Sequence, residues 1–461
     1  MAWNRRQRPV MENSITEGVI WKTLLSFFFP ILLGTFFQQM YNTVDAIIVG
    51  KFVGKEALAA VGGATGSLVN LIVGFFTGLA SGATVVLSQF YGGRKDREVS
   101  DTVHTAAALA LTMGLFLTVA GIWLSPMLLA LLGTPEDVMR PSIIYLTIYF
   151  IGMIPSLIYN IGSGLLRAVG DSRRPLFFLI VACMTNVVLD VVLVVGFDMG
   201  VAGAAWATIL SQLASAVLIV ITLMRSHTSY RLQPRRIRFH GNLMSRIVKI
   251  GLPAGLQTSM YGVANIIVQA GVNSFGTDAI AAYTAFGKLD GFYWMVLGAF
   301  GVAITTFVGQ NFGAQKFDRL KKSVRVCLMQ ATVTTVVMCT GLLLFGRSLY
   351  HMFTDDAQVI EQGMVMLNIL APAYIAYVCI EIFSGALRGV GDTLVATLFT
   401  FFGICVFRVI WVTVVVPLNH TLTTLMLCFP ITWVITSLLF IVYYLWGGWM
   451  KRAMRRAGLK A

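Results

Sequence analysis

Apolar stretches long enough to cross a bilayer as α-helices recur along the whole chain of 461 residues. Only 12% of the residues are charged, about half the share found in a soluble domain. Because backbone polar groups in lipid must pair within a segment, we predict an all-α polytopic membrane protein with twelve transmembrane helices. The predicted spans are 20–49, 57–90, 103–132, 141–166, 174–197, 200–225, 246–275, 279–312, 324–352, 358–387, 393–417 and 423–449.

The spans form two groups of six that repeat each other. SGLLRAVGD, from Ser163, returns as SGALRGVGD from Ser384, which is 221 residues later. SQFYGGRKD, from Ser88, returns at the same spacing as GQNFGAQKF from Gly309. An even number of spans keeps both copies in one orientation, so we predict two six-helix lobes related by a pseudo-two-fold axis along the membrane normal. Duplicated bundles of this kind are typical of transporters.

Basic residues divide the chain and predict its orientation. A segment 1–19 precedes the N-lobe 20–225, a basic linker 226–245 leads to the C-lobe 246–450, and a basic tail 451–461 follows. If both termini are cytoplasmic, 28 of the 34 Lys and Arg residues lie on the inside and 4 on the outside. This asymmetry predicts a multi-pass protein of the plasma (inner) membrane with both termini in the cytoplasm. It also explains the net charge of +14 without a nucleic-acid partner.

The first span carries a polar face and a helix-disrupting proline. Gln38, Tyr41, Asn42 and Asp45 fall at i, i+3, i+4 and i+7, which places them on one face of a helix. An ionisable side chain in a span must face a protein or water-filled interior, because its burial in lipid is costly. Pro30 removes one backbone donor from this helix, so we expect a bend there and treat Pro30 as a candidate hinge.

A second intramembrane carboxylate, Asp190, lies in span five with Asn186 one turn before it. Neither span offers Asp45 or Asp190 a basic partner, so we expect two unpaired carboxylates in one confined chamber. Such a pair can exchange protons, or it can hold a cation with help from Tyr41, Asn186 and Thr208. If Na⁺ is the coupling ion, Asp45 and Asp190 are its predicted ligands, and no other metal or cofactor is expected.

The internal repeat indicates where ion coupling takes place. The counterparts of Asp45 and Asp190 in the second copy are Ile267 and Trp411, give or take one residue. Because the frame was copied and the carboxylates were not, we predict that coupling belongs to the first six spans.

Four further charges, Lys288, Asp290, Glu381 and Arg408, fall inside spans of the second half. Their signs are mixed, so we expect them to neutralise one another through pairs between helices such as Glu381–Arg408. A role in substrate binding remains an alternative for this group.

Together these segments resemble the multidrug and toxic compound extrusion (MATE) family over essentially the whole chain, from Trp21 to the last span. The matching motifs are P…Q…YNTVDAIIVG…ALAAVG, which begins in span one and ends in span two, LLRAVGDSRRP after span four, TNVVLDVVLVVGFDMGVAGAAWAT across spans five and six, and LRGVGDT in the second half. The resemblance implies two lobes around a central cleft and export of organic cations or other amphipathic compounds against protons or sodium. It also implies bending at Pro30 and a cation site in the first half. The residues of that site are Tyr41, Asp45, Asn186, Asp190 and Thr208.

One departure from the family concerns the second lobe. Some members carry acidic residues in spans seven and ten, where this chain has Tyr261 and Tyr377, with Glu381 one turn further on. The candidate substrate-binding residues are Gln38, Asn42, Asn160, Tyr261, Tyr377 and Glu381.

We therefore predict a secondary active multidrug antiporter that works by alternating access, a monomer whose partners are small organic, mainly cationic, compounds and the lipid bilayer. The alternative is a lipid-linked saccharide flippase of related architecture, which needs a cationic cleft and which Lys288 and Arg408 would serve. An intramembrane enzyme is disfavoured because no H-E-x-x-H, D-D-x-x-D or G-x-S-x-G occurs in the sequence. ATP-driven transport is disfavoured because no G-x-x-x-x-G-K-[ST] occurs.

Overall fold

A computed structural model describes residues 14–459, and this part of the chain is helical with no β-strand. Residues 1–13 of the predicted N-terminal segment and 460–461 of the tail lie outside the described residues. The first half contains α1 (Ser14–Glu17), α2 (Ile20–Phe52), α3 (Lys55–Gly62), α4 (Ala64–Gly92), α5 (Asp96–Leu131), α6 (Glu136–Ile151), α7 (Met153–Ala168), α8 (Arg173–Asp190), the π-helical η1 (Val191–Gly196) and α9 (Gly200–Arg225).

The second half follows a 3₁₀ turn in the linker, η2 (Pro234–Arg236). It contains α10 (Gly241–Asn273), α11 (Thr277–Gly313), α12 (Phe317–His351), α13 (Ala357–Val390), α14 (Thr393–Thr400), η3 (Phe401–Val406), α15 (Phe407–Ile410), η4 (Trp411–Val415), α16 (Val416–Leu418), α17 (Leu422–Trp446) and α18 (Trp449–Arg456). Elements η3 and η4 are π-helical.

The described helices account for all twelve predicted spans. Ten of them are long and apolar enough to cross a membrane, with α3 and α4 taken as one, and α6 and α7 form a further span bent by 51°. The twelfth is α10, which has 33 residues like α2 but is too polar to be identified by composition. The prediction of an all-α polytopic protein is confirmed, and the exact boundaries of its lobes stay a prediction.

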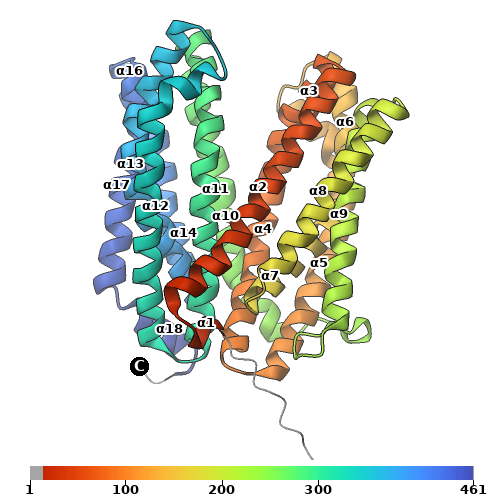
Figure 1. Cartoon of the computed structure of the whole chain (residues 1–461), viewed down its shortest axis with the longest axis vertical. Coiled ribbons are helices and arrows are strands. Elements are labelled where there is room, and N and C mark those ends of the chain that lie inside the picture. The colour runs from red at the N-terminus through yellow and green to blue at the C-terminus, as the bar shows by residue number, and fades with distance from the viewer. Residues whose placement is uncertain (1–13, 460–461) are drawn as a thin grey trace, which may run out of the picture.

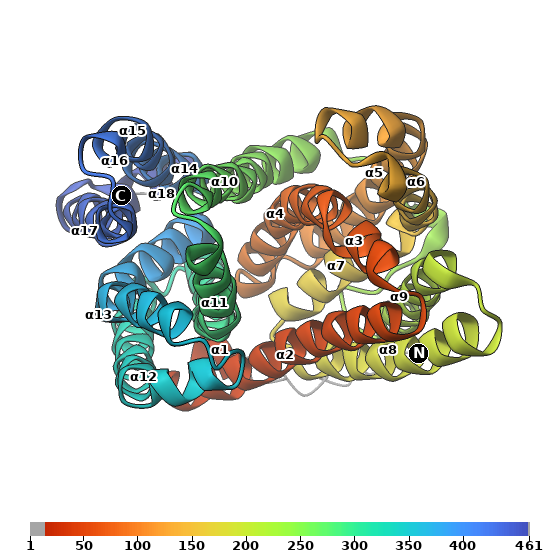
Figure 2. The same ribbon diagram turned by 90° about the horizontal axis from the view of Figure 1, so that it is seen from above.

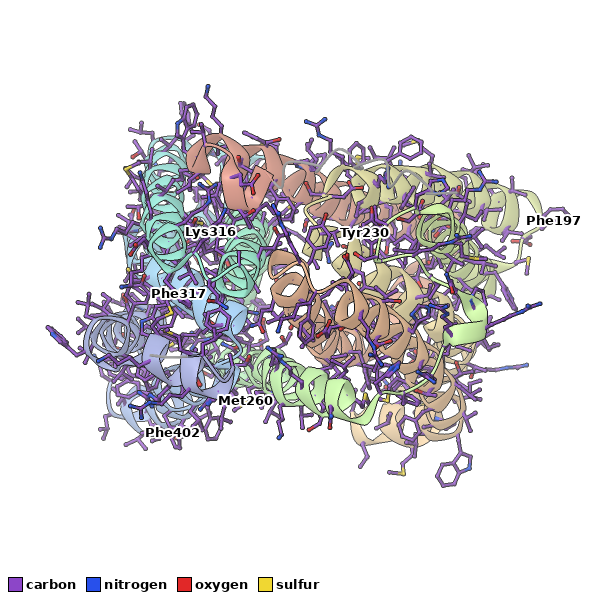
Figure 3. All side chains as sticks on the ribbon, turned by 90° about the horizontal axis from the view of Figure 1, so that it is seen from below. Phe197, Tyr230, Met260, Lys316, Phe317 and Phe402 are labelled. Atoms are coloured by element: carbon purple, nitrogen blue, oxygen red, sulfur yellow. The ribbon has the colours of Figure 1, made fainter. Side chains whose placement is uncertain are left out.

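The two halves form two bundles that diverge towards the end where α3, α6 and α16 lie (Figure 1). They converge at the opposite end, which carries α1 and α18 and which we call the terminal end. Seen from above, α11 to α18 lie on one side and α3 to α9 on the other, with α2 along one edge and α10 along the opposite edge (Figure 2). Phe197 and Phe402 project from the outer faces of the two bundles (Figure 3) and are 70% and 59% exposed, as expected of lipid-facing side chains.

Helix α2 begins against the second bundle and ends in the first. Near its start, Phe28 stacks on Phe300 of α11, with ring centroids 4.1 Å apart. After Pro30 it packs on α8, where Gly34 faces Leu179. The helix is continuous through Pro30. Because Phe28 contacts the second bundle and Gly34 contacts the first, Pro30 lies where α2 passes from one bundle to the other.

Helix α10 joins the bundles in a corresponding way. Its first half packs against α4 so closely that a Cβ atom at Gly78 would lie 2.4 Å from the Cα atom of Gly255. A Cβ atom at Gly82 would similarly lie 2.8 Å from the backbone nitrogen of Gly251. Small residues at this four-residue spacing allow two backbones to approach each other in a membrane.

At the terminal end, the repeated motifs bind each other reciprocally. The Gln89 side-chain amide donates to the carbonyl oxygen of Gly389 at 2.7 Å, and the Gln310 amide donates to that of Ala168 at 2.6 Å. Donors and acceptors are each related by the repeat offset of 221 residues. All four residues are buried, so these bonds are shielded from water.

Two glycines bring the backbones of α4 and α11 together beside these bonds. A Cβ atom at Gly92 would lie 2.0 Å from the carbonyl oxygen of Gln310, and one at Gly313 would lie 1.7 Å from that of Gln89. No side chain fits at either position without separating the helices. We call this set the terminal clasp, and it consists of Gln89, Gly92, Ala168, Gln310, Gly313 and Gly389.

Candidate ion and substrate sites

The two predicted carboxylates are buried inside the first bundle. Asp45 on α2 is 6% exposed, and Asp190 at the end of α8 is fully buried. The π-helical segment η1 begins at the residue after Asp190, and π-helical turns are frequent at functional sites. Asp45 and Asp190 are close enough to interact electrostatically.

Asp45, Asp190 and Asn186 carry buried polar atoms that lack partners within residues 14–459. Oxygen Oδ1 of Asp45, both carboxylate oxygens of Asp190 and both polar side-chain atoms of Asn186 accept or donate no hydrogen bond there. No Lys, Arg or His of the described chain forms an ion pair with either aspartate. Because buried polar atoms are almost always paired, this cluster is suited to a proton, water or a small cation.

Tyr41 and Thr208, the other predicted members, lie on α2 and α9. Tyr41 is partly buried and interacts electrostatically with Asp45. Thr208 is 5% exposed, and its hydroxyl donates to the carbonyl oxygen of Ala204 at 3.0 Å. The Thr208 oxygen therefore keeps its lone pairs for a cation, although no contact joins it directly to the aspartates.

Sequence reasoning missed Tyr145 on α6. This side chain is 7% exposed and interacts electrostatically with both Asp45 and Asp190, so it belongs to the same chamber. Tyr149, one turn later, stacks on it with ring centroids 6.1 Å apart. Two tyrosines at i and i+4 in span four were the available signal, because their hydroxyls need polar neighbours when buried.

The candidate substrate residues of the first half are dispersed. Gln38 and Asn42 are exposed on α2, whereas Asp45 on the same helix is buried. Asn160 on α7 is partly buried and donates its side-chain amide to the carbonyl oxygen of Ser156 at 2.9 Å. The structure shows no contact that unites these three in one site.

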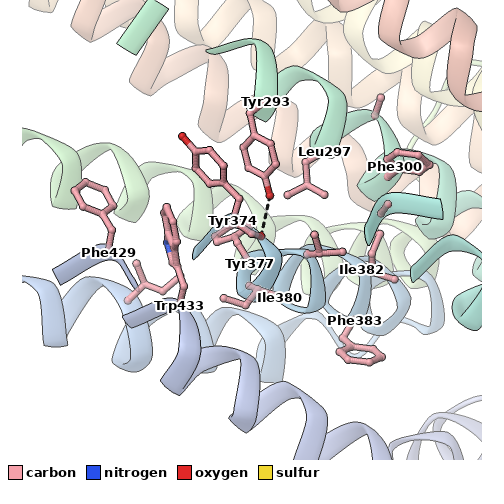
Figure 4. Close-up of a cluster of buried hydrophobic side chains, with 14 of the residues drawn as sticks. Tyr293, Leu297, Phe300, Tyr374, Tyr377, Ile380, Ile382, Phe383, Phe429 and Trp433 are labelled. Atoms are coloured by element: carbon pink, nitrogen blue, oxygen red, sulfur yellow. Dashed lines mark hydrogen bonds between the residues drawn. The ribbon is translucent and has the colours of Figure 1, made fainter. Parts of the chain in front are cut away.

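The second bundle contains a pocket of about 430 Å³. Two of the candidate substrate residues, Tyr261 and Tyr377, line it, and their hydroxyls lie 3.0 Å apart. Figure 4 shows Trp433 and Phe429 on α17 beside Tyr374 and Tyr377 on α13. The lining residues are Tyr261, Asn265, Gln269, Tyr283, Phe286, Asp290, Trp294, Leu370, Tyr374, Tyr377, Arg408, Phe429 and Trp433.

Comparison with known proteins decides the family. The MatE family model matches residues 30–192 and again residues 253–414, which together make up more than half of the chain. The chain belongs to the MatE family. The double match also agrees with the internal repeat, because one model describes both halves. A member of this family is a membrane transporter and not an enzyme.

Individual relatives of this MATE transporter cover most of its length. It is 29% identical to the probable multidrug resistance protein YpnP of Bacillus subtilis, over 82% of this chain and 84% of the relative. It is 27% identical to the probable multidrug resistance protein YoeA of the same organism, over 86% and 87% of the two chains. A solved structure of a MOP superfamily transporter from Pyrococcus furiosus superposes with a TM-score of 0.88 at 21% identity, covering 97% and 100%.

The predicted neutralisation of the second-half charges of this MATE transporter is wrong for the pair that we named. Glu381 pairs with Arg388 of its own helix, at 3.6 Å between Oε1 and Nη2, and it does not line the pocket. The two residues are seven apart on α13 and so share one face, whereas Arg408 lies on α15. Arg408 instead donates to the Asn265 side chain at 3.1 Å.

The other two charges also lack the expected ion pairs among the described residues. Lys288 is exposed on α11 without a carboxylate within 4.0 Å. Asp290 accepts hydrogen bonds from the Trp294 indole at 2.6 Å and from the Tyr374 hydroxyl. Lys288, Asp290 and Arg408 are thus not paired with one another.

Proposed function

We propose that this MATE transporter is a secondary active multidrug antiporter that exports amphipathic organic compounds in exchange for protons or Na⁺. The observation that carries the proposal is the pair of buried, unpaired carboxylates Asp45 and Asp190. Relatives named as multidrug resistance proteins, which match over more than four fifths of the chain, support the substrate class. The +14 net charge and its distribution support cytoplasmic termini in the plasma membrane.

The geometry indicates how ion binding and drug export are linked. With both termini cytoplasmic, the bundles are closed on the inside by the terminal clasp and diverge towards the outside. An ion from outside then reaches Asp45 and Asp190 and satisfies their unpaired oxygens. Neutralising these carboxylates weakens their attraction for a cationic compound, so drug and ion compete for the same charges. Two bundles in one chain complete a pathway, so a monomer suffices.

Helix α2 is the proposed moving part. It carries Asp45 in its later half, packs on the second bundle in its first turns, and has Pro30 between these two regions. Loading Asp45 changes the hydrogen bonding of the later half, and bending at Pro30 lets that half move without unpacking the first turns.

The test is gradient-driven transport in everted vesicles, whose interior corresponds to the outside of the cell. We expect Asp45→Asn and Asp190→Asn each to lower drug accumulation by about tenfold or more under an imposed proton or Na⁺ gradient, a change of roughly 1.4 kcal/mol or more in coupling. Imposing the two gradients separately identifies the ion. Asp198→Asn, which alters an exposed carboxylate eight residues after Asp190, is the matched control and should transport normally.

Full gradient-driven accumulation in both Asn variants would contradict the assignment. The melting temperature of the same preparations separates loss of coupling from loss of folded protein.

A further inference from the structure

Arg408 is a buried cation without a carboxylate partner. Its side chain is 3% exposed in the pocket of the second bundle, and no ion pair within residues 14–459 includes it. Its Nη1 atom donates to Asn265, and its guanidinium carbon lies 4.3 Å from the centre of the Phe429 ring. Its Nε atom has no hydrogen-bond partner. A buried guanidinium with unused donors is costly unless an anion binds it.

Asp290, the acidic residue of the same pocket, lies on a different helix from Arg408. Asp290 on α11 is fixed by the Trp294 indole and the Tyr374 hydroxyl, so it does not neutralise Arg408 through a contact. Tyr283 on α11, which also lines the pocket, is within electrostatic reach of both charges. The pocket therefore offers separate positions for a positive and a negative group.

Aromatic rings form the remaining walls. Trp294 meets Tyr377 edge to face with ring centroids 4.6 Å apart, and Trp433 lies 5.6 Å from Tyr377 and 5.7 Å from Tyr374. Such rings contact a flat apolar body over a large area at low cost in conformational entropy. The volume of about 430 Å³ lies within the range of pockets that hold drug-sized ligands.

We propose that this pocket binds aromatic zwitterions, with the ligand's acidic group at Arg408 and its basic group at Asp290. The inference rests on the proposed function, because such a ligand is then a transported compound. It adds a requirement that the first bundle does not supply, because the charged groups identified there are both acidic. A compound that carries only a basic group leaves the Arg408 guanidinium without an anion and binds less tightly.

The test measures binding of three probes to the purified full-length protein by isothermal titration calorimetry, without any gradient. The probes are 4-(2-aminoethyl)benzoic acid, its methyl ester, which lacks the anion, and its N-acetyl derivative, which lacks the cation. In the unmodified protein we expect the zwitterion to bind about tenfold or more tightly than the ester, the worth of a charge-assisted hydrogen bond. We also expect it to bind more tightly than the N-acetyl derivative.

Variants assign each preference to one residue. Arg408→Gln should bring the ratio of zwitterion to ester affinity close to one, Arg408→Lys should keep part of it, and Asp290→Asn should remove the preference over the N-acetyl derivative only. Lys288→Gln, which removes a nearby cation outside the pocket lining, should leave both ratios unchanged. Each ratio is taken within one preparation, so a variant that is partly unfolded still gives a valid result.

Equal affinity for acid and ester in the unmodified protein, or an unchanged ratio in Arg408→Gln, would overturn the inference. These outcomes are independent of ion coupling, because Asp45→Asn should lose gradient-driven transport and keep both binding ratios. Gradient-driven transport without a preference for the zwitterion would contradict only the pocket assignment. A preference for the zwitterion without gradient-driven transport would contradict only the proposed antiport.

Discussion

The two bundles share one helical frame but differ in charge at corresponding places. At the repeat offset of 221 residues Asp190 corresponds to Trp411, and Arg408 lies three residues before Trp411. The counterpart of Asp45 is close to Ile267, two residues from the Asn265 that binds Arg408. The first bundle thus has two unpaired acids where the second has an unpaired base. The two halves therefore form similar chambers whose buried side chains differ in charge.

The backbone irregularity at this level is common to both copies. The π-helical segment η1 (Val191–Gly196) follows Asp190, and η4 (Trp411–Val415) begins at its counterpart. A π-helical turn leaves backbone groups poorly paired and rotates the side chains after it. Both copies keep this π-helical turn while their polar residues differ. The turn is therefore a feature of the shared backbone, and the difference between the two chambers lies in their side chains.

The terminal clasp shows the opposite behaviour, because there the glutamine that donates and the glycine at the close contact are the same in both copies. Gln89 and Gln310 each donate to the carbonyl of the other half, so the two bonds are related by the pseudo-two-fold axis. This part of the repeat joins the bundles instead of binding a ligand. The comparison therefore separates symmetric residues that join the bundles from asymmetric residues to which we assign binding in the proposals above.

The largest expected effect comes from filling the clasp. Gly92→Ala and Gly313→Ala place a methyl group within 2.0 Å and 1.7 Å of a carbonyl oxygen of the opposite helix. Overpacking of this kind costs about 1–3 kcal/mol, so both variants should melt at lower temperature and transport about tenfold less. Because the sites are related by symmetry, the two effects should be similar.

Gly341→Ala is the control for the glycine variants, because a Cβ atom there meets nothing within 4 Å. It should melt and transport like the unmodified protein. Normal transport by Gly313→Ala would mean that α4 and α11 do not stay in contact there, which would remove the basis of the symmetric clasp.

The fold could be predicted from the sequence because its strongest signals are local or periodic. Apolar length predicts the spans, and the pair SGLLRAVGD and SGALRGVGD predicts the duplication. The contacts made by these motifs could not be predicted, since Gln89 and Gly389 are 300 residues apart and a repeat reveals equivalence rather than contact. α10 was among the spans predicted from apolar length, although it is more polar than the ten helices that are identified as spans by composition.

The candidate sites were predictable to the extent that burial alone decides them. An unpaired carboxylate in a span must face the interior, and Asp45 and Asp190 do so. The ion-pair partner of Glu381 depends on how the helices pack around its side chain. Arg388 of the same helix lies within ion-pair distance of Glu381, and Arg408 does not. Tyr145 was missed because a tyrosine in an apolar run looks like a membrane or core residue until its neighbours are known.

An intermediate effect is expected from removing one clasp hydrogen bond at a time. Gln310→Leu removes the bond to Ala168, and Gln89→Leu removes the bond to Gly389 together with the one that Gln89 accepts from Arg246. Each variant leaves a buried carbonyl unsatisfied, which costs about 1–3 kcal/mol and favours separation of the terminal end. Spin labels at Lys55 and Asp355, both exposed, report the other end of the molecule. In a background without the native cysteines, both variants should raise the population with a short distance between these labels by at least about fivefold.

The two glutamine variants are each other's control, because they break symmetry-related bonds. Shifts in opposite directions, or no shift in either variant, would show that the bonds do not hold the terminal end closed. Binding of the zwitterionic probe should be retained in both, since neither residue lines the pocket of the second bundle.

The smallest effect is expected from the prolines of the two helices that connect the bundles. Pro30→Ala restores a backbone donor in α2 and favours a straight helix, so transport should slow about two- to fivefold, equivalent to at most about 1 kcal/mol. Pro253→Ala makes the same change in α10, which lacks a carboxylate at the position matching Asp45. If ion loading acts through the helix that carries Asp45, only Pro30→Ala should alter how transport rate depends on ion concentration. Equal changes in both variants would mean that the prolines serve the shared frame, and that coupling does not pass through α2.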